Sequence, residues 1–144
     1  MPGRMGASAS GFQLEWFGPD FFRKQLDKVD REIRVAEFAI QRDVKKRMSE
    51  PGTGRTYRSR GSSRDHVASA PGHAPAVDLG ELRNGVVTKH ERHALHVVGT
   101  IGVRQGLGPR AMHLEDPDGL NRPAFIPAYE AEKPRLMARL KKPT

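Results

Sequence analysis

The chain has 144 residues, of which 36% are hydrophobic and 29% are charged, a composition typical of a folded domain with a modest core rather than of a disordered chain. Its 25 Lys and Arg outnumber its 17 Asp and Glu, for a formal net charge of +8, and a chain this basic is attracted to nucleic acid or to acidic protein surfaces. The absence of cysteine excludes a disulfide framework and a thiolate metal site, and it fits assembly in a reducing cytoplasm.

Residues 1–17 begin with a run of small side chains, and we expect a flexible N-terminal segment there. No apolar run follows Arg4, so the segment does not resemble a secretory signal. The apolar runs elsewhere are too short to cross a membrane. We expect residues 18–144 to form a single α+β domain with a basic arm inserted at about 51–77.

A long helix is predicted after Pro19, a residue that suits the first helical turn because its missing N–H costs nothing there. Apolar residues then recur at steps of three and four: Phe22, Leu26, Val29, Ile33, Ala36, Ile40, Val44 and Met48. This spacing predicts one amphipathic helix, about 40 Å long, that ends before Pro51. Such a stripe needs a sheet or a neighbouring subunit to cover it, and we expect Ile33, Ile40 and Val44 to pack between subunits.

The segment 51–77 contains mainly Gly, Ser, Pro and Arg. Two short extended runs flank Gly61-Ser62-Ser63, which predicts a β-hairpin arm. A hairpin without an apolar face is marginal in water, so the arm is either a solvated loop or a limb that becomes ordered on a neighbouring surface. In the second reading an aromatic anchor and four arginines make the contacts: Arg55, Tyr57, Arg58, Arg60 and Arg64.

The next elements are short. Asp78 is expected to cap a helical turn over 78–83. The β-branched runs 86–88 and 94–99 predict antiparallel strands joined by a turn at Glu91-Arg92. A glycine-rich loop over 102–108, a helical turn over 111–115 and a turn over 116–119 follow.

The C-terminal helix is predicted to start at Pro127 after an extended run. We expect Pro134 to kink or split it. Four of its residues are expected to face inward: Phe125, Tyr129, Leu136 and Leu140. Phe125 is also a candidate for packing between subunits. The fold expected from these elements is α+β, with the N-terminal and C-terminal helices packed on a small antiparallel sheet and an extended hairpin arm.

The histidines do not predict a metal site. His90, His93 and His96 are spaced by three, and three imidazoles can hold zinc, but the residues around them indicate strand, turn and strand, which would scatter the rings. The serines are concentrated in the arm, a poor place to hold a catalytic geometry. We therefore expect no enzyme and no cofactor, and keep a metal-dependent enzyme only as a remote alternative.

Four motifs over residues 29–140 resemble the tail-component family of long-tailed bacteriophages, small proteins encoded between the head and tail genes that complete the head–tail junction. They are Pro51-Gly52-Thr53-Gly54-Arg55-Thr56-Tyr57, the run from Ala68 to Ala76, the run from Asp78 to Arg83, and Arg122-Pro123-Ala124-Phe125-Ile126-Pro127-Ala128. The chain departs from the family at Leu79, where members usually have Thr, near Gly85, where they have Ser, and after Glu115, where they have an aromatic-Gly-Thr.

The resemblance implies a structural protein of the virion neck, assembled in the host cytoplasm. It implies a ring, usually six-fold, whose partners are copies of itself, the adaptor or stopper proteins and the tail tube protein, with weak contact to DNA in the lumen. Stopper, tail terminator and tail-completion protein remain open. A general electrostatic nucleic-acid-binding module is the alternative, although the chain shows no helix-turn-helix or zinc finger and the arm has one Tyr, too few for a stacking platform.

Overall fold

The computed structural model describes residues 3–8, 11–16, 18–58, 63, 65–76 and 80–143. They form helices and antiparallel strand pairs, which confirms the predicted α+β class. In chain order the elements are β1 Gly3–Ser8, β2 Gly11–Trp16, α1 Gly18–Arg47, β3 Thr56–Arg58, β4 Asp65–Val67, α2 Glu81–Asn84, β5 Val86–Arg92, β6 Val97–Val103, α3 Gly108–Glu115 and α4 Phe125–Lys141. The strands pair as three separate hairpins, β1–β2, β3–β4 and β5–β6.

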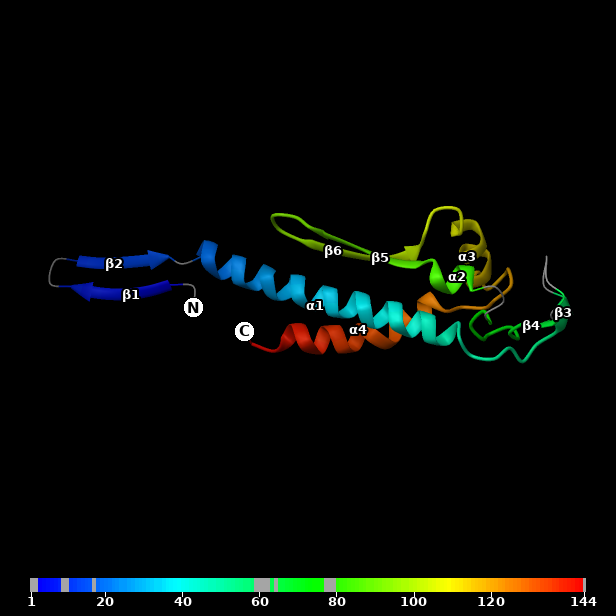
Figure 1. The fold of residues 1–144 in the computed structure, drawn as a ribbon. Coiled ribbons are helices and arrows are strands. Elements are labelled where there is room, and N and C mark those ends of the chain that lie inside the picture. Colours follow the sequence, from blue (N-terminus) through cyan, green and yellow to red (C-terminus); the bar gives the residue numbers. More distant parts are fainter. Residues whose placement is uncertain are drawn as a thin grey trace.

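The long helix α1 is the axis of the molecule (Figure 1). The β5–β6 hairpin lies along one side of it and α4 along another, and both make extensive contacts with it. The predicted long helix is therefore confirmed, and the N-terminal hairpin and the arm project at opposite ends of the molecule. No helix among the described residues is long and apolar enough to span a membrane.

The core lies at the C-terminal end of α1, where α2, α3 and the starts of β5 and α4 meet. Its buried members are Ile40, Val44, Met48, Leu82, Val86, Leu114, Ala124 and Ala128. Val44 is fully buried, whereas Phe22, at the other end of the same stripe, is 65% exposed. The apolar stripe of α1 is thus covered by its own chain along its second half and left open toward its N-terminus.

The β5–β6 hairpin differs from its predicted form. The pattern predicts a turn at Glu91-Arg92, but these residues belong to β5, and the chain turns at 93–96 instead. The partner strand then runs to Val103, and it includes Gly102, which was predicted to lie in a loop. The prediction ended the strand too early because glycines there weaken the strand pattern. In the structure the hydrogen bonds to β5 and the contact with α1 stabilise the strand.

Three further expectations need correction. The short helix α2 begins after Gly80, which is its N-cap in a left-handed conformation, so Asp78, outside the described residues, is not the cap. Helix α4 begins at Phe125, before Pro127, and Pro134 does not split it. Both Pro134 and Glu130 are exposed, so water can reach the Glu130 carbonyl that loses its helical donor.

The N-terminal segment also differs, since the sequence pattern predicts no strands within 1–17. Strands β1 and β2 pair antiparallel there, from Gly3 opposite Trp16 to Ser8 opposite Gly11. In this register apolar residues are partners of one another, Met5 with Leu14 and Ala7 with Phe12. The small residues of β1 give no strand pattern by themselves. The match of apolar residues becomes apparent only when β1 and β2 are aligned as antiparallel partners.

Candidate interaction surfaces

The predicted arm is a hairpin in the structure. Strands β3 and β4 pair antiparallel, with Tyr57 opposite His66, and the two rings meet edge to face with centroids 5.3 Å apart. Tyr57 is 47% exposed, and Val67 at the other end of β4 is 41% exposed. The aromatic predicted to anchor the arm on a partner is therefore held in place and accessible.

Two glycines hold the base of the arm together. Gly54 donates its N–H to the Ala68 carbonyl (2.6 Å), and Ala68 donates to the Arg55 carbonyl (3.0 Å). A Cβ atom on Gly52 would clash with the Val67 backbone, and one on Gly54 would lie 2.9 Å from the Ala68 carbonyl oxygen. Only glycine permits this close backbone approach. Ala68 and Ser69 are buried, so the base of the arm belongs to the body of the protein.

The predicted arm arginines divide into two groups. Arg55 and Arg58 are exposed, and neither has an ion-pair partner among the described residues. Arg60 and Arg64 lie outside the described residues. The described part of the arm is therefore a basic, accessible surface around Tyr57.

The predicted subunit-packing residues lie mostly inside the protein. Ile40 is 7% exposed and Val44 is fully buried in the chain's own core. The prediction that these two pack between subunits was wrong, because β5, α2 and α4 already cover this part of the stripe and leave no surface for a neighbour. Ile33 and Phe125 are partly buried, and Phe125 packs against the core.

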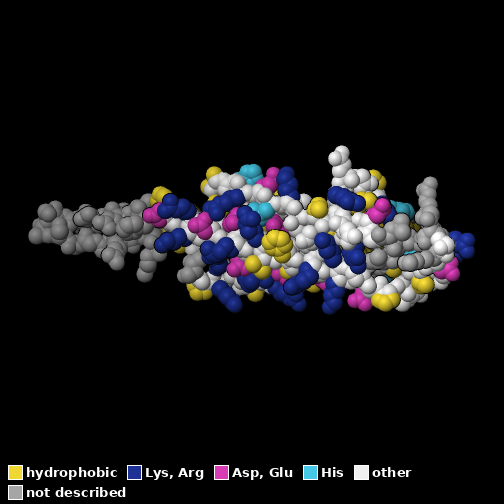
Figure 2. Space-filling model, in the orientation of Figure 1, with side chains coloured by type: hydrophobic (Ala, Val, Ile, Leu, Met, Phe, Trp, Pro, Cys, Tyr) yellow, Lys and Arg dark blue, Asp and Glu magenta, His cyan; other side chains and the backbone are white. Residues whose placement is uncertain are grey.

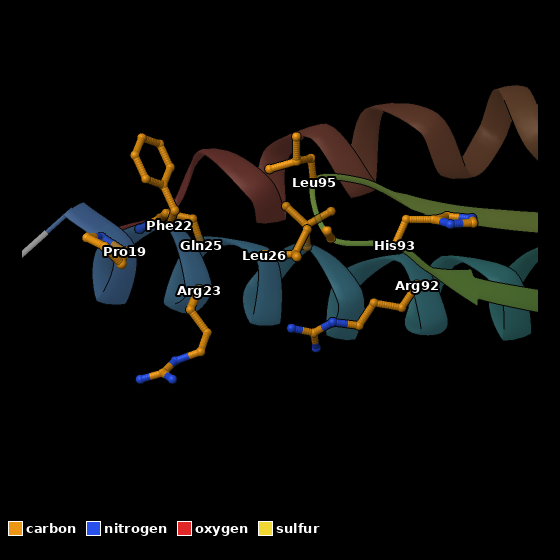
Figure 3. Close-up of a pocket in the computed structure, with 10 residues that line it drawn as sticks. Pro19, Phe22, Arg23, Gln25, Leu26, Arg92, His93 and Leu95 are labelled. Carbon is orange, nitrogen blue, oxygen red and sulfur yellow. The ribbon is translucent and has the colours of Figure 1, made fainter.

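An apolar groove occupies the open end of the α1 stripe. It has a volume of about 500 Å³ and lies between the first turns of α1 and the turn of the β5–β6 hairpin. Figure 3 shows Leu95 of the turn reaching over Leu26 of α1, with Phe22 beside them and Arg23 and Arg92 at the rim. Phe22 is 65% and Leu95 90% exposed. The sequence did not predict Leu95 as a surface residue because the pattern assigned it to a strand. It lies in the hairpin turn, where its side chain is exposed.

Polar contacts fix the β5–β6 hairpin on α1. His90 of β5 lies between two carboxylates of α1, with Nδ1 2.8 Å from Glu37 Oε1 and Nε2 2.9 Å from Asp30 Oδ1. The hydrogen bond to Asp30, and then that to Glu37, raise the pKa of His90 above its ordinary value, because two carboxylates favour a ring that donates from both nitrogens. Gln41 also donates to the Val86 carbonyl (3.0 Å).

The other histidines of the predicted trio stand apart from this cluster. His93 and His96 stack on each other at the hairpin turn, with ring centroids 4.3 Å apart. The described residues contain no group of three or more side chains suited to hold a metal ion. Of the three histidines spaced by three, His93 and His96 therefore contact each other, and His90 contacts α1 instead.

Ion pairs also join α4 to α1. Arg139 of α4 bonds Glu32 of α1 (2.6 Å) and the buried Glu132 of its own helix (2.8 Å). Lys28 of α1, itself buried, donates to the carbonyls of Leu140 and Lys142 at the end of α4, where a helix attracts positive charge. These polar contacts help to hold α4 against α1.

No protein-family model, curated protein or solved structure matches this chain.

Proposed function

We propose that this chain is a structural subunit of a ring at the head–tail junction of a tailed bacteriophage, where it completes the tail and connects it to the proteins below the portal. The ring consists of copies of the chain, six by resemblance to the tail-component family. Its role is mechanical, and it needs no catalytic residue and no cofactor.

One observation carries the proposal: the apolar groove at the open end of the α1 stripe. Phe22 and Leu95 are largely exposed, and charged side chains rim the groove between them. Exposed apolar patches rimmed by polar groups commonly mark protein contacts. A ring built from head-to-tail contacts would cover this groove in every subunit.

The arrangement of the family-like motifs adds support. They lie far apart in the sequence but meet at the C-terminal end of α1. Pro51, Ser69 and Pro123, from three of the motifs, line one small hollow, and Leu82 of the remaining motif packs with Ala124 in the core. The motifs therefore form one corner of the fold, where they can act as a unit.

The experiment that tests this function is a measurement of the assembly state of the full chain by light scattering and electron microscopy. We expect closed rings of one size, or rings that form when tail tubes are added. The double variant Phe22→Ser/Leu95→Ser should reduce assembly at least tenfold while the monomer stays folded. Met112→Ser, at an apolar residue of α3 that is 75% exposed, is the matched control. A protein that remains monomeric with and without tail tubes contradicts the proposal.

The alternative of a general nucleic-acid-binding module is favoured by Arg55 and Arg58 on the arm, which have no acidic partner in the part of the chain that the structure describes. It predicts tight binding to duplex DNA that weakens steeply with salt, since each neutralised phosphate releases counterions. The ring proposal predicts weak binding, because a conduit that gripped DNA would slow its passage. A filter-binding titration at two salt concentrations separates the two functions.

A further inference from the structure

Helix α1 uses all of its acidic residues in contacts within the chain. Each of these side chains bonds a cation: Asp20 with Arg23, Asp27 with Arg92, Asp30 with His90 and Arg34, Glu32 with Arg139, Glu37 with His90, and Asp43 with Arg47. Several cations of the same helix have no acidic partner among the described residues: Lys24, Arg31, Arg42, Lys45 and Lys46. The helix therefore presents a net positive surface that no acid of the described residues neutralises.

These cations share a face with two exposed apolar side chains. Arg31, Val35, Phe38, Arg42 and Lys45 follow one another at steps of four and three, which places them in one line along α1. Val35 is 51% and Phe38 62% exposed, so this line, the outer stripe, points away from the core. Figure 2 shows Lys and Arg side chains gathered along the molecule with hydrophobic side chains among them.

A groove continues the outer stripe toward α4. It has a volume of about 570 Å³, and small side chains of both helices line it: Ala39, Ala128 and Ala131. Four cations, Arg42, Lys46, Arg47 and Arg135, also line it, together with two carboxylates that are already paired, Asp43 with Arg47 and Glu132 with Arg139. Arg135 is largely exposed, 3.7 Å from Glu132. Small side chains let another backbone approach closely, and the basic residues would hold its acidic groups.

We propose that the outer stripe and this groove bind an acidic amphipathic helix of a different protein, with the acids on the cations and an apolar residue against Val35 and Phe38. From Arg31 to Lys45 the stripe is about 20 Å long, the length of a few turns of a bound helix. Helices commonly bind in such grooves through apolar anchors at steps of three and four, with Arg and aromatic residues as the main contacts.

Charge argues against one other occupant of the stripe, and the exposed apolar residues argue against a second. A second copy of this chain carries a net charge of +8, and its α1 has no unpaired acid to offer. Nucleic acid would match the charge, but a phosphate backbone makes no use of Val35 and Phe38 at the centre of the stripe. An acidic protein helix satisfies both the charge and the apolar centre.

The inference is independent of ring formation, and it can be tested on full-length protein at concentrations too low for assembly. The probes are a labelled helical peptide with one stripe of Leu flanked by Glu, polyglutamate of the same length, and a DNA duplex. We expect the peptide to bind more tightly than either polyanion. Phe38→Ser should weaken binding of the peptide at least fivefold and leave binding of polyglutamate unchanged.

Charge reversal is the second part of the test. Arg31→Glu/Arg42→Glu should weaken peptide binding at least tenfold, whereas Arg110→Glu/Lys133→Glu, with the same change in net charge on α3 and α4, should weaken it less than twofold. Equal effects of the two double variants would mean that only overall charge matters and would overturn the inference. Tighter binding of the duplex than of the peptide would also overturn it, in favour of nucleic acid.

Discussion

His90 of β5 and Gly99 of β6 lie directly opposite each other in the strand ladder, and the missing side chain of Gly99 is what lets the hairpin approach α1 closely enough for His90 to bond Glu37. A Cβ atom on Gly99 would overlap the Glu37 carboxylate and would lie 2.8 Å from Ile33 Cγ2. This contact fixes the hairpin on the helix, and with it the apolar groove at the hairpin turn.

Gly99→Ala should therefore destabilise the protein by about 1–3 kcal/mol, because the added methyl group overpacks the contact with α1. Gly102→Ala is the matched control on the same strand, since a Cβ there meets no atom within 4 Å, and it should change stability by less than about 1 kcal/mol. Urea unfolding followed by circular dichroism measures both. Equal stability of the two variants would refute the close contact.

The His90 cluster predicts a pH dependence of stability. The pKa of His90 is raised in the folded state, chiefly by its hydrogen bonds to Asp30 and Glu37, so its contribution is fully present below the unfolded value of about 6.5 and is lost as the pH rises through the folded value. The pKa of Asp30 is lowered, chiefly by its hydrogen bond to His90. The contribution of Asp30 is therefore lost as the pH falls below about 3.8 through the folded value.

The measurement for His90 is the melting temperature as a function of pH. His90→Gln should flatten the fall in Tm of the wild-type protein above pH 6.5, while His93→Gln at the hairpin turn should retain it. Parallel curves for the wild-type protein and His90→Gln would show that another group causes the pH dependence.

Glu115 joins the end of α3 to the start of α4. Its Oε1 atom accepts hydrogen bonds from the N–H groups of Ala124 (2.5 Å) and Phe125 (2.8 Å), groups that the helix itself leaves without partners. Glu115→Ala should cost about 1–2 kcal/mol, the usual effect of removing a helix cap. Asp118→Asn, in the exposed turn nearby, should leave the urea midpoint unchanged; a midpoint for Glu115→Ala equal to that of the wild-type protein would rule out the capping role.

We expect a substitution in the arm to reduce assembly without changing the stability of the fold. Tyr57→Ala removes an exposed side chain that touches mainly His66, so stability should change by less than about 0.5 kcal/mol, while ring assembly or tail attachment should fall at least fivefold. Tyr129 of α4, which was expected to face inward, is instead 53% exposed, and Tyr129→Ala should do neither. An assembly yield that Tyr57→Ala leaves intact would mean that the arm is a solvated loop.

Local patterns in the sequence determined the long helix, the arm and the α+β class, because each rests on features confined to neighbouring residues. The steps of three and four from Phe22 to Met48 specify one helix whatever surrounds it. Gly61-Ser62-Ser63 between two extended runs likewise predicted the hairpin of β3 and β4.

Only the tertiary structure decided which surfaces are covered. Ile40 and Phe22 occupy equivalent positions in the apolar stripe, yet one is buried and the other is 65% exposed. The difference arises because segments distant in sequence converge on one end of α1, and burial depends on those neighbours. The charge of the outer stripe also depends on distant segments. The acids of α1 pair with His90, Arg92 and Arg139, and this pairing, which cannot be read from neighbouring residues, leaves the outer stripe basic.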